Sequence, residues 1–289
     1  MRLGVVILPE HRWSDAQALW RRAEELGFDH AWTYDHLTWR SFRDRPWFGA
    51  VPTLTAAALV TSHIRLGPLV TSPNFRHPLP LAKELVTLDD LSDGRLTVGI
   101  GSGGTGWDAS MLGQAPWSPA ERAARFEEFA DVLDLLLREP EVSVTGRFYS
   151  AHSARTHPGC VQQPRVPFVV AASGPRALAI AARHGAAWVT TGDRTGDGSV
   201  PASEGAKIVG RQIARLEEAC AGVERDPGSI ERMVLTGPEL DPGLRSVEAF
   251  RDTVGHYESI GVTDLVVHWP RPEPPYAADQ ATFERIFSA

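Results

Sequence analysis

The sequence is poor in the residues that mark secreted, membrane-spanning or nucleic-acid-binding proteins. It has two cysteines, Cys160 and Cys220, far apart and without CxxC or histidine spacing, so neither a disulfide framework nor a metal site is indicated. The formal net charge is −7 and no Lys/Arg-rich run interrupts it, which argues against a nucleic-acid partner. The apolar runs are too short for a membrane span or a signal-peptide core, so we expect a cytoplasmic protein without a membrane partner.

Lysine is also scarce, since only Lys83 and Lys207 occur among 29 basic residues. We attribute this to a GC-rich genome rather than to a binding function. What the sequence does contain is the balance of a soluble globular protein, with 43% hydrophobic and 22% charged residues. A length of 289 residues allows two ordinary domains or one large α/β barrel.

Short apolar runs alternate with amphipathic segments along the whole chain, a pattern typical of βα units with a parallel sheet. Eight such runs are rich in β-branched or aromatic residues and bounded by Gly, Pro or Asp: residues 3–8, 30–35, 64–70, 96–101, 167–172, 186–191, 232–237 and 264–269. Eight rounds in this length favour a closed (β/α)8 TIM barrel over a doubly wound sheet. We therefore expect an α/β protein in which residues 1–289 form one barrel domain.

The segments between these runs carry helix-start patterns. Ser14, with Gln17 three residues later, predicts the start of the first helix, which Gly27 ends. Ser118, Pro119 and Glu121 predict a capped start for a helix after the fourth strand. Turn-rich stretches at residues 139–164 and 192–205 read as short insertions, the first after this helix and the second after the sixth strand.

Polar residues gather at the predicted carboxyl ends of the strands, the face that holds the active site of a parallel barrel. Asp35 and His36 follow the second strand, and His268 lies at the end of the eighth. Each of these taken alone is also what an ordinary polar loop would contain.

The combined pattern, in this order, resembles the bacterial luciferase-like flavin and deazaflavin oxidoreductases. The motifs are TYDHL after the second strand, LGPLVTSPNFRHP at the third, LSDGRLTVGIGSGG through the fourth, and VVAASGPRALAIAARHGAAWVTTG through the fifth and sixth. The resemblance extends over essentially the whole chain. It implies a TIM barrel and a redox enzyme with coenzyme F420 or FMN as the cofactor.

The resemblance implies a cis peptide bond between Leu69 and Val70, in a bulge whose backbone supports the central ring of the cofactor. This bulge accounts for the prolines around the third strand. The strand ends there in a curved backbone surface, so it does not need to continue its hydrogen-bonded pairing with neighbouring strands. The alternative is an ordinary trans strand end. Thr71, which follows, is included among the expected cofactor-binding residues.

The same resemblance assigns roles to further residues. It makes His36 the proton donor or acceptor, with Asp35 beside it at the cofactor; the alternative is an exposed His36 and an Asp35 that caps its loop. Gly99, Gly101 and Gly104 also fit the GxGxxG spacing of a dinucleotide fold, but no helix is expected directly after them and three strands precede them. The expected cofactor contacts are Gly101, Ser102 and Gly103 in the glycine-rich turn, Ala172, Ser173, Gly174 and Pro175 at a helix start suited to a phosphate, and Thr190.

Tryptophans complete the expected site. Trp39, Trp107 and Trp269 fall in or beside loops of the same face, where they would form a substrate pocket or merely cover the barrel. Some deazaflavin relatives carry a glutamate where this sequence has Gly104, so that acid is either absent or replaced, with Asp108 the nearby alternative.

The leading hypothesis is an oxidoreductase that transfers a hydride between F420 and an unidentified small organic substrate. An FMN-dependent monooxygenase is the alternative. A metal-dependent barrel hydrolase is less favoured, since the end of the first strand offers only Glu10 and His11 as ligands, and we expect no metal. A non-catalytic flavin-binding protein is a further alternative. Members of this family commonly form homodimers, so a homodimer is possible here, but the sequence itself leaves open whether these chains pair.

Overall fold

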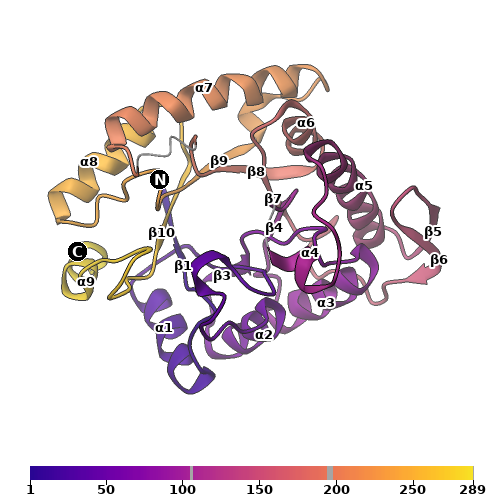
Figure 1. Cartoon of the computed structure of the whole chain (residues 1–289), viewed down its shortest axis with the longest axis horizontal. Helices are drawn as coiled ribbons and strands as arrows, with labels where there is room; N and C mark the ends of the chain where they lie inside the picture. Colours follow the sequence, from indigo (N-terminus) through magenta and orange to yellow (C-terminus); the bar gives the residue numbers. More distant parts are fainter. Residues whose placement is uncertain (105–106, 194–197, 289) are drawn as a thin grey trace.

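The computed structural model describes residues 1–104, 107–193 and 198–288. Eight short parallel strands form a central ring with helices around it (Figure 1). The strands are β1 (Arg2–Val6), β2 (His30–Thr33), β3 (Arg65–Pro68), β4 (Val98–Gly101), β7 (Phe168–Ala171), β8 (Gly185–Thr190), β9 (Glu231–Leu235) and β10 (Asp264–His268). Each coincides with one of the eight predicted runs, so the predicted (β/α)8 barrel is confirmed.

The order around the sheet is β3-β2-β1-β10-β9-β8-β7-β4. Strands β3 and β4 close the ring through parallel bridges between Leu66 and Leu96 and between Thr71 and Ile100. The first and last strands of the chain are neighbours, since β1 pairs with β10 along its whole length. This order places β9 and β10 across the barrel from β3.

The helices cover the outside of the ring (Figure 1). They are α1 (Trp13–Glu25), α2 (Ala50–Val60), α3 (Pro78–Leu91), the short α4 (Trp107–Met111), α5 (Pro119–Arg138), α6 (Pro175–His184), α7 (Ala202–Ala221), α8 (Val247–Glu258) and α9 (Gln280–Phe287), with 3₁₀ turns at Arg40–Phe42 and Pro227–Ser229. None of the helices in the described ranges is long and apolar enough to cross a lipid bilayer.

The hydrophobic core has two parts, because successive side chains of a strand point to opposite faces. On β10, Val266 packs inside the barrel, whereas Leu265 and Val267 pack against the surrounding helices. The inner cluster contains large side chains such as Trp32 and Met233. The barrel is therefore a filled core rather than a pore, and an open site can form only at one of its ends.

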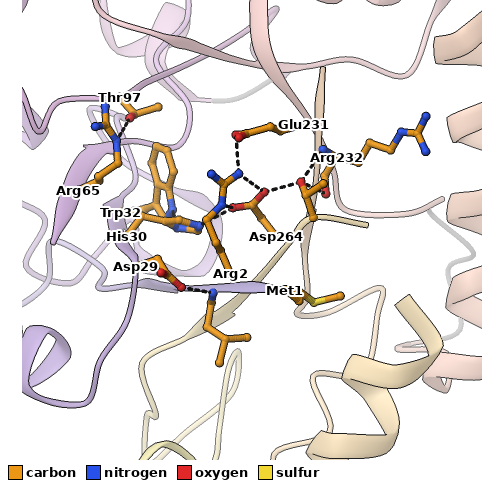
Figure 2. Close-up of polar contacts among 12 residues, drawn as sticks. Met1, Arg2, Asp29, His30, Trp32, Arg65, Thr97, Glu231, Arg232 and Asp264 are labelled. Carbon is orange, nitrogen blue, oxygen red and sulfur yellow. Dashed lines mark hydrogen bonds and ion pairs between the residues drawn. The ribbon is translucent and has the colours of Figure 1, made fainter. Parts of the chain in front are cut away.

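The amino-terminal ends of the strands are occupied by a polar network (Figure 2). The Asp264 carboxylate, 1% exposed, binds Arg2 through two bonds of 2.8 Å. The same carboxylate is 3.0 Å from Nε2 of His30, whose Nδ1 accepts a 2.6 Å hydrogen bond from the Trp32 indole. Because Nδ1 is the acceptor, Nε2 carries the proton that His30 donates to Asp264.

The predicted helix starts are partly right. Ser118 accepts a hydrogen bond from the amide of Glu121 and Pro119 opens α5, as expected. The capping role of Ser14 was wrong: α1 begins at Trp13 after Arg12, without a side-chain cap, and Ser14 lies inside its first turn.

The two predicted insertions differ in outcome. Residues 139–164 contain an antiparallel hairpin of β5 (Glu141–Thr145) and β6 (Ser150–Arg155), which projects beyond α5 in Figure 1. The stretch 192–205 is shorter than predicted, since α7 already starts at Ala202, and residues 194–197 of it lie outside the described residues.

Candidate active site

A cavity of about 960 Å³ opens at the carboxyl ends of the strands. Its lining comes from the segments after β2, β3, β4, β7, β8, β9 and β10, so nearly the whole ring contributes to it. The volume is at the upper end of the range for sites that enclose a drug-sized ligand. The cavity is therefore large enough for a tricyclic cofactor ring together with a substrate.

One wall of the cavity is the end of β3. The peptide bond between Leu69 and Val70 is cis, as predicted, and both residues line the cavity. Behind them, a Cβ atom on Gly101 of β4 would stand 2.8 Å from Cγ2 of Val70, so only glycine allows this close approach. Gly101 thus lets β4 lie close against the end of β3 at this wall.

His36 and Asp108 form a hydrogen-bonded pair at the cavity. Nδ1 of His36 lies 2.7 Å from Oδ2 of the buried Asp108, whose Oδ1 accepts the amide of Leu37 at 2.8 Å. A carboxylate is an acceptor only, so Nδ1 of His36 carries the proton. Nε2 is then the acceptor nitrogen, and no residue of the described ranges bonds to it. The arrangement suits a group that accepts or returns a proton in the cavity.

Asp35, the neighbour of His36, points elsewhere. Its buried carboxylate holds Arg76 in a two-bond ion pair, with distances of 2.7 and 3.0 Å. Asp35 is not part of the cavity wall, so the prediction of a direct cofactor contact is not supported by its position. It fixes instead the segment after β3, in which Arg76 also approaches Glu84 at 3.3 Å.

Aromatic rings form the wall beside and across from β3. The Tyr34 hydroxyl lies 2.8 Å from Nε2 of His268 and 3.3 Å from the hydroxyl of Tyr276. The Tyr276 ring stacks on His268 with centroids 3.5 Å apart and planes within 7°. Trp39 stacks on Tyr276 at 6.1 Å, and Trp47 stacks on Trp39 at 6.3 Å.

Burial shifts the pKa values of the side chains in this wall. It raises the pKa of Tyr276 to about 12, raises the pKa of Tyr34 well above its ordinary value, and lowers the pKa of His268 to about 3. The two phenols and the imidazole are therefore uncharged at neutral pH.

The far side of the cavity is formed by β7, β8 and the start of α6. Gly174 is the N-cap of α6 and makes no side-chain capping bond, so Ser173 is not the cap. The first-turn amides of the helix are left for another acceptor, next to the exposed Ser173. The Thr190 hydroxyl is already hydrogen-bonded to the Gln212 side chain at 2.7 Å.

The structure brings most of the predicted site residues to this cavity. Those that line it are His36, Trp39, Leu69, Val70, Gly101, Ser102, Gly103, Trp107, Ala172, Ser173 and Thr190. Those outside its lining are Asp35, Thr71, Gly174, Pro175 and Trp269. Gly174 and Pro175 nevertheless adjoin it as the first residues of α6.

Trp269 and Thr71 are displaced for identifiable reasons. Trp269 follows His268, and the alternation along the strand turns it outward, where its ring packs on Phe283 of α9 at 5.3 Å. Thr71 is buried, and its backbone joins β3 to β4 through bonds with Gly99 and Gly101. Its hydroxyl is buried, and Thr71 is not among the residues that line the cavity.

The expectation that no helix follows the glycine-rich turn was wrong. Helix α4 starts at Trp107 and its second residue is Asp108, which reaches His36. This helix has only five residues and follows the fourth strand of a barrel, so it does not revive the dinucleotide fold.

Sequence reasoning did not assign Tyr34 or Tyr276 to the site. Tyr34 lies in the TYDHL motif, at the end of the second predicted strand, and this position could have indicated that it belongs to the site. Tyr276 follows two prolines beyond β10, and nothing local in the sequence predicts that it folds back onto His268.

The fold and the cavity are those of an α/β barrel with an enzyme-like site. Comparison with known proteins narrows the class of protein. Residues 1–242 match the sequence profile of the luciferase-like monooxygenase family. The chain is 33% identical over 260 residues to an F420-dependent glucose-6-phosphate dehydrogenase of Beutenbergia cavernae, covering 84% of this chain and 71% of that protein. It is 29% identical to a 5,10-methylenetetrahydromethanopterin reductase of Methanopyrus kandleri, covering 77% and 66%.

A solved structure supports the same fold. An F420-dependent secondary alcohol dehydrogenase, in complex with an F420-acetone adduct, superimposes with a TM-score of 0.81 at 19% identity, covering 99% of this chain and 97% of the other. At this identity the likeness shows the fold alone. With the profile match, we conclude that the chain belongs to the luciferase-like monooxygenase family.

Proposed function

We propose that this protein is an oxidoreductase that transfers a hydride between coenzyme F420 and an organic substrate. The observation that carries the proposal is the His36–Asp108 pair, which stands at the same cavity as the cis Leu69–Val70 peptide. The F420-dependent relatives supply the identity of the cofactor. Hydride transfer needs a ring support and a proton-transfer group in one enclosed space, and the cavity holds candidates for both.

The cavity residues fit such a cofactor. Leu69 and Val70 form a surface of the cavity against which a flat ring could pack. Gly101, Ser102 and Gly103 line the cavity as well. Thr38 also lines the cavity, and its hydroxyl oxygen is buried without a hydrogen-bond partner within the described ranges. A buried hydroxyl without a partner is costly, so a bound ligand with polar ring edges would satisfy it.

The phosphate-bearing part of the cofactor is proposed to lie at Ser173 and the start of α6. Helix amides without a side-chain cap favour an anion, and Ser173 adds a hydroxyl donor. Gly174 and Pro175 act here through the helix backbone. Ala172 and Thr190 line the cavity and are proposed to contact the cofactor between its phosphate and its ring.

When bound, F420 supplies obligate two-electron chemistry, taking up or giving back a hydride at its ring. Nε2 of His36 accepts the proton that an alcohol loses from its oxygen on oxidation, or returns one in the reverse reaction. Asp108 holds the imidazole with the proton on Nδ1, and Trp47 donates to the His36 carbonyl oxygen at 2.9 Å. The Tyr34 ring stands edge-on to this imidazole, with the ring centroids 6.4 Å apart.

A cofactor titration tests the proposal. Oxidised and reduced F420 and, separately, FMN are added to the purified protein while tryptophan fluorescence is recorded, because Trp39 lies in the cavity wall. We expect saturable quenching by F420 and little by FMN. Tight FMN binding, or a flavin spectrum in the purified protein, would overturn the F420 assignment and support the monooxygenase alternative. A metal-dependent hydrolase is disfavoured by Glu10, whose carboxylate is bound by Arg271 at 2.6 Å.

The homodimer expected from the family also stays a prediction. Sedimentation velocity across a range of concentrations tests it, with a single species of twice the chain mass as the expected result.

A further inference from the structure

One arginine joins the loops that follow three neighbouring strands at the open end of the barrel. Arg271 lies in the loop after β10 and is 8% exposed. Its guanidinium binds both carboxylate oxygens of Glu10, which follows β1, at 2.6 and 3.1 Å. It also lies over the ring of Phe42, in the loop after β2, at 4.5 Å from the ring centroid. Because β10, β1 and β2 are consecutive in the sheet order, this side chain spans one continuous sector of the barrel mouth.

The same guanidinium fixes the loop that carries it. It donates to the carbonyl oxygens of Glu273 and Pro275 at 2.9 Å each. The backbone adds two bonds, from the Arg271 amide to the Tyr276 carbonyl at 3.2 Å and from the Ala278 amide to the Arg271 carbonyl at 3.1 Å. A guanidinium only donates, and carboxylate and carbonyl oxygens only accept, so the direction of each of these bonds is unambiguous. The loop is therefore folded around the Arg271 side chain.

This loop and Phe42 support the aromatic wall of the cavity. Tyr276 has φ +68° and its ring stacks on Trp39. A left-handed backbone is uncommon for a residue with a side chain, so it persists only where the surroundings hold it. Phe42 packs on the rings of Trp39 and Trp47, in each case with centroids 5.7 Å apart. Arg271 therefore lies behind both parts of the wall, although it is itself outside the cavity lining.

The cofactor contacts proposed above come from a different sector of the ring. Leu69 and Val70 follow β3, Gly101 ends β4, and Ser173 lies between β7 and α6. These three strands are also neighbours, since β4 pairs with β7 and β3 closes the ring onto β4. The bonds of Arg271 involve none of these segments. Its influence is therefore confined to the part of the cavity that the cofactor does not occupy in the proposed arrangement.

We propose that Arg271, together with Glu10, is a positioning residue for substrate binding. It sets the aromatic wall against which an apolar part of the substrate lies, and it leaves the hold on the cofactor unchanged. This inference rests on the proposed function for the identity of the two ligands. The position of the wall is a property of the chain alone, so it can be measured without either ligand.

Conservative variants test the role of this side chain. Arg271→Lys keeps the charge but lacks the planar fork that reaches a carboxylate and two carbonyls at once. Glu10→Gln keeps the size of the side chain but leaves the guanidinium without its counter-ion. Because Arg271→Lys retains a cation for Glu10, it carries the test if Glu10→Gln fails to fold.

The matched control is Glu273→Gln, in the same loop. The Glu273 side chain forms an exposed ion pair with Arg45 at 3.0 Å, whereas its backbone carbonyl is the group that Arg271 uses. The control therefore removes a surface ion pair and leaves the bonds of Arg271 in place. We expect it to match the parent protein in both measurements below.

The first measurement needs no ligand. Hydrogen exchange followed by mass spectrometry reports on the loop, because the amides of Arg271 and Ala278 are hydrogen-bonded within it. We expect this segment to exchange about 10-fold faster or more in Arg271→Lys and in Glu10→Gln. The β5–β6 hairpin, which has no contact with Arg271, should exchange as in the parent protein.

The second measurement separates the substrate from the cofactor. Acetophenone is the substrate probe, because it combines a flat apolar ring with a carbonyl group that can accept a hydride. Its Kd is measured by calorimetry on the protein alone and on the F420-loaded protein, and the Kd of F420 is measured in parallel. We expect Arg271→Lys to weaken acetophenone binding about 10-fold and F420 binding less than threefold, because only the wall loses its preformed position. Ser173→Ala should have the reverse effect on the two ligands.

Several results would overturn the proposal. Exchange and affinities equal to those of the parent protein in Arg271→Lys and Glu10→Gln would do so, as would an equal loss of affinity for both ligands, which indicates a general loss of structure. An acetophenone that does not bind the parent protein would show that the wall is not a surface for an apolar substrate. Failure of the parent protein to bind F420 would refute the proposed function alone, because the exchange and the acetophenone affinities are also measured without the cofactor.

Discussion

At the residue scale, two adjacent side chains have separate tasks. Asp35 is buried in an ion pair with Arg76, whereas His36 faces the cavity and is oriented by Asp108. The buried pair fixes the backbone at the end of β2, and that backbone sets the position of the imidazole. The two residues are therefore neighbours in the chain with different surroundings, and the cofactor contact expected of Asp35 stays a prediction.

Asp108→Asn tests the orienting role. The two carboxylate oxygens accept from His36 and from the Leu37 amide, but an asparagine has one acceptor oxygen for both. We expect kcat/KM to fall about 10- to 100-fold, with a shifted pH–rate profile and an F420 affinity changed by less than roughly threefold. Steady-state kinetics across pH measure this.

The control for that experiment is Asp44→Asn, an exposed residue of the loop after the 3₁₀ turn. Its kinetics should match the parent protein. If Asp108→Asn behaved in the same way as this control, Asp108 would have no role in orienting His36.

At the element scale, the closure of the barrel depends on close backbone contact between β3 and β4. A Cβ atom on Gly67 would collide with the Thr97 carbonyl oxygen, and one on Gly99 with the Pro68 carbonyl oxygen. Backbone cannot move aside as a flexible side chain can. These two glycines are therefore required by the seam that also carries the Leu69–Val70 wall.

Gly67→Ala is expected to destabilise the protein by about 3 kcal/mol, because the added methyl group overpacks the seam. Gly210→Ala is the matched control: Gly210 lies inside α7 with open space around it, so alanine should stabilise by about 0.5–1 kcal/mol. Urea denaturation followed by circular dichroism measures both. A Gly67→Ala variant as stable as the parent would mean that the seam is looser than described.

At the scale of the whole molecule, the two ends of the barrel have opposite characters. The carboxyl end is open, with uncharged aromatic side chains along one wall of its cavity, whereas the amino end is occupied by the ion pairs and hydrogen bonds around Asp264 (Figure 2). Burial would raise the pKa of Asp264, but the hydrogen bonds from His30, Arg2 and Thr263 outweigh it and hold that pKa below its ordinary value.

This shift makes stability depend on pH in a defined direction. A carboxyl group with a lowered pKa in the folded state stabilises the protein above its unfolded pKa of about 3.9, and the contribution is lost as pH falls through the folded value. We expect the free energy of unfolding to decline below about pH 4. Asp264→Asn should lose about 2–3 kcal/mol at pH 7 and show a shallower decline in acid.

Denaturant titrations at a series of pH values measure this, with the exposed Asp90→Asn as the control that keeps the parent slope. Parallel acid profiles for the parent and Asp264→Asn would show that another group governs the acid response.

The sequence by itself determined the barrel and the location of its site. The eight strands have a local pattern of β-branched and aromatic residues, and parallel βα order then places all their carboxyl ends on one face. The positions of His36, Val70 and Ser173 at that face followed from this order. Motif resemblance added the cis bond at Leu69–Val70, which no local pattern of residues predicts.

Only the tertiary structure decided which neighbours those residues meet. The pairing of His36 with Asp108, 72 positions away, and of Tyr34 with His268, 234 positions away, depends on how strands distant in the chain become adjacent. The outward turn of Trp269 and the return of Tyr276 onto His268 likewise depend on strand register and loop closure. Side-chain partners of this kind are set by packing over long sequence separations, which a linear pattern does not encode.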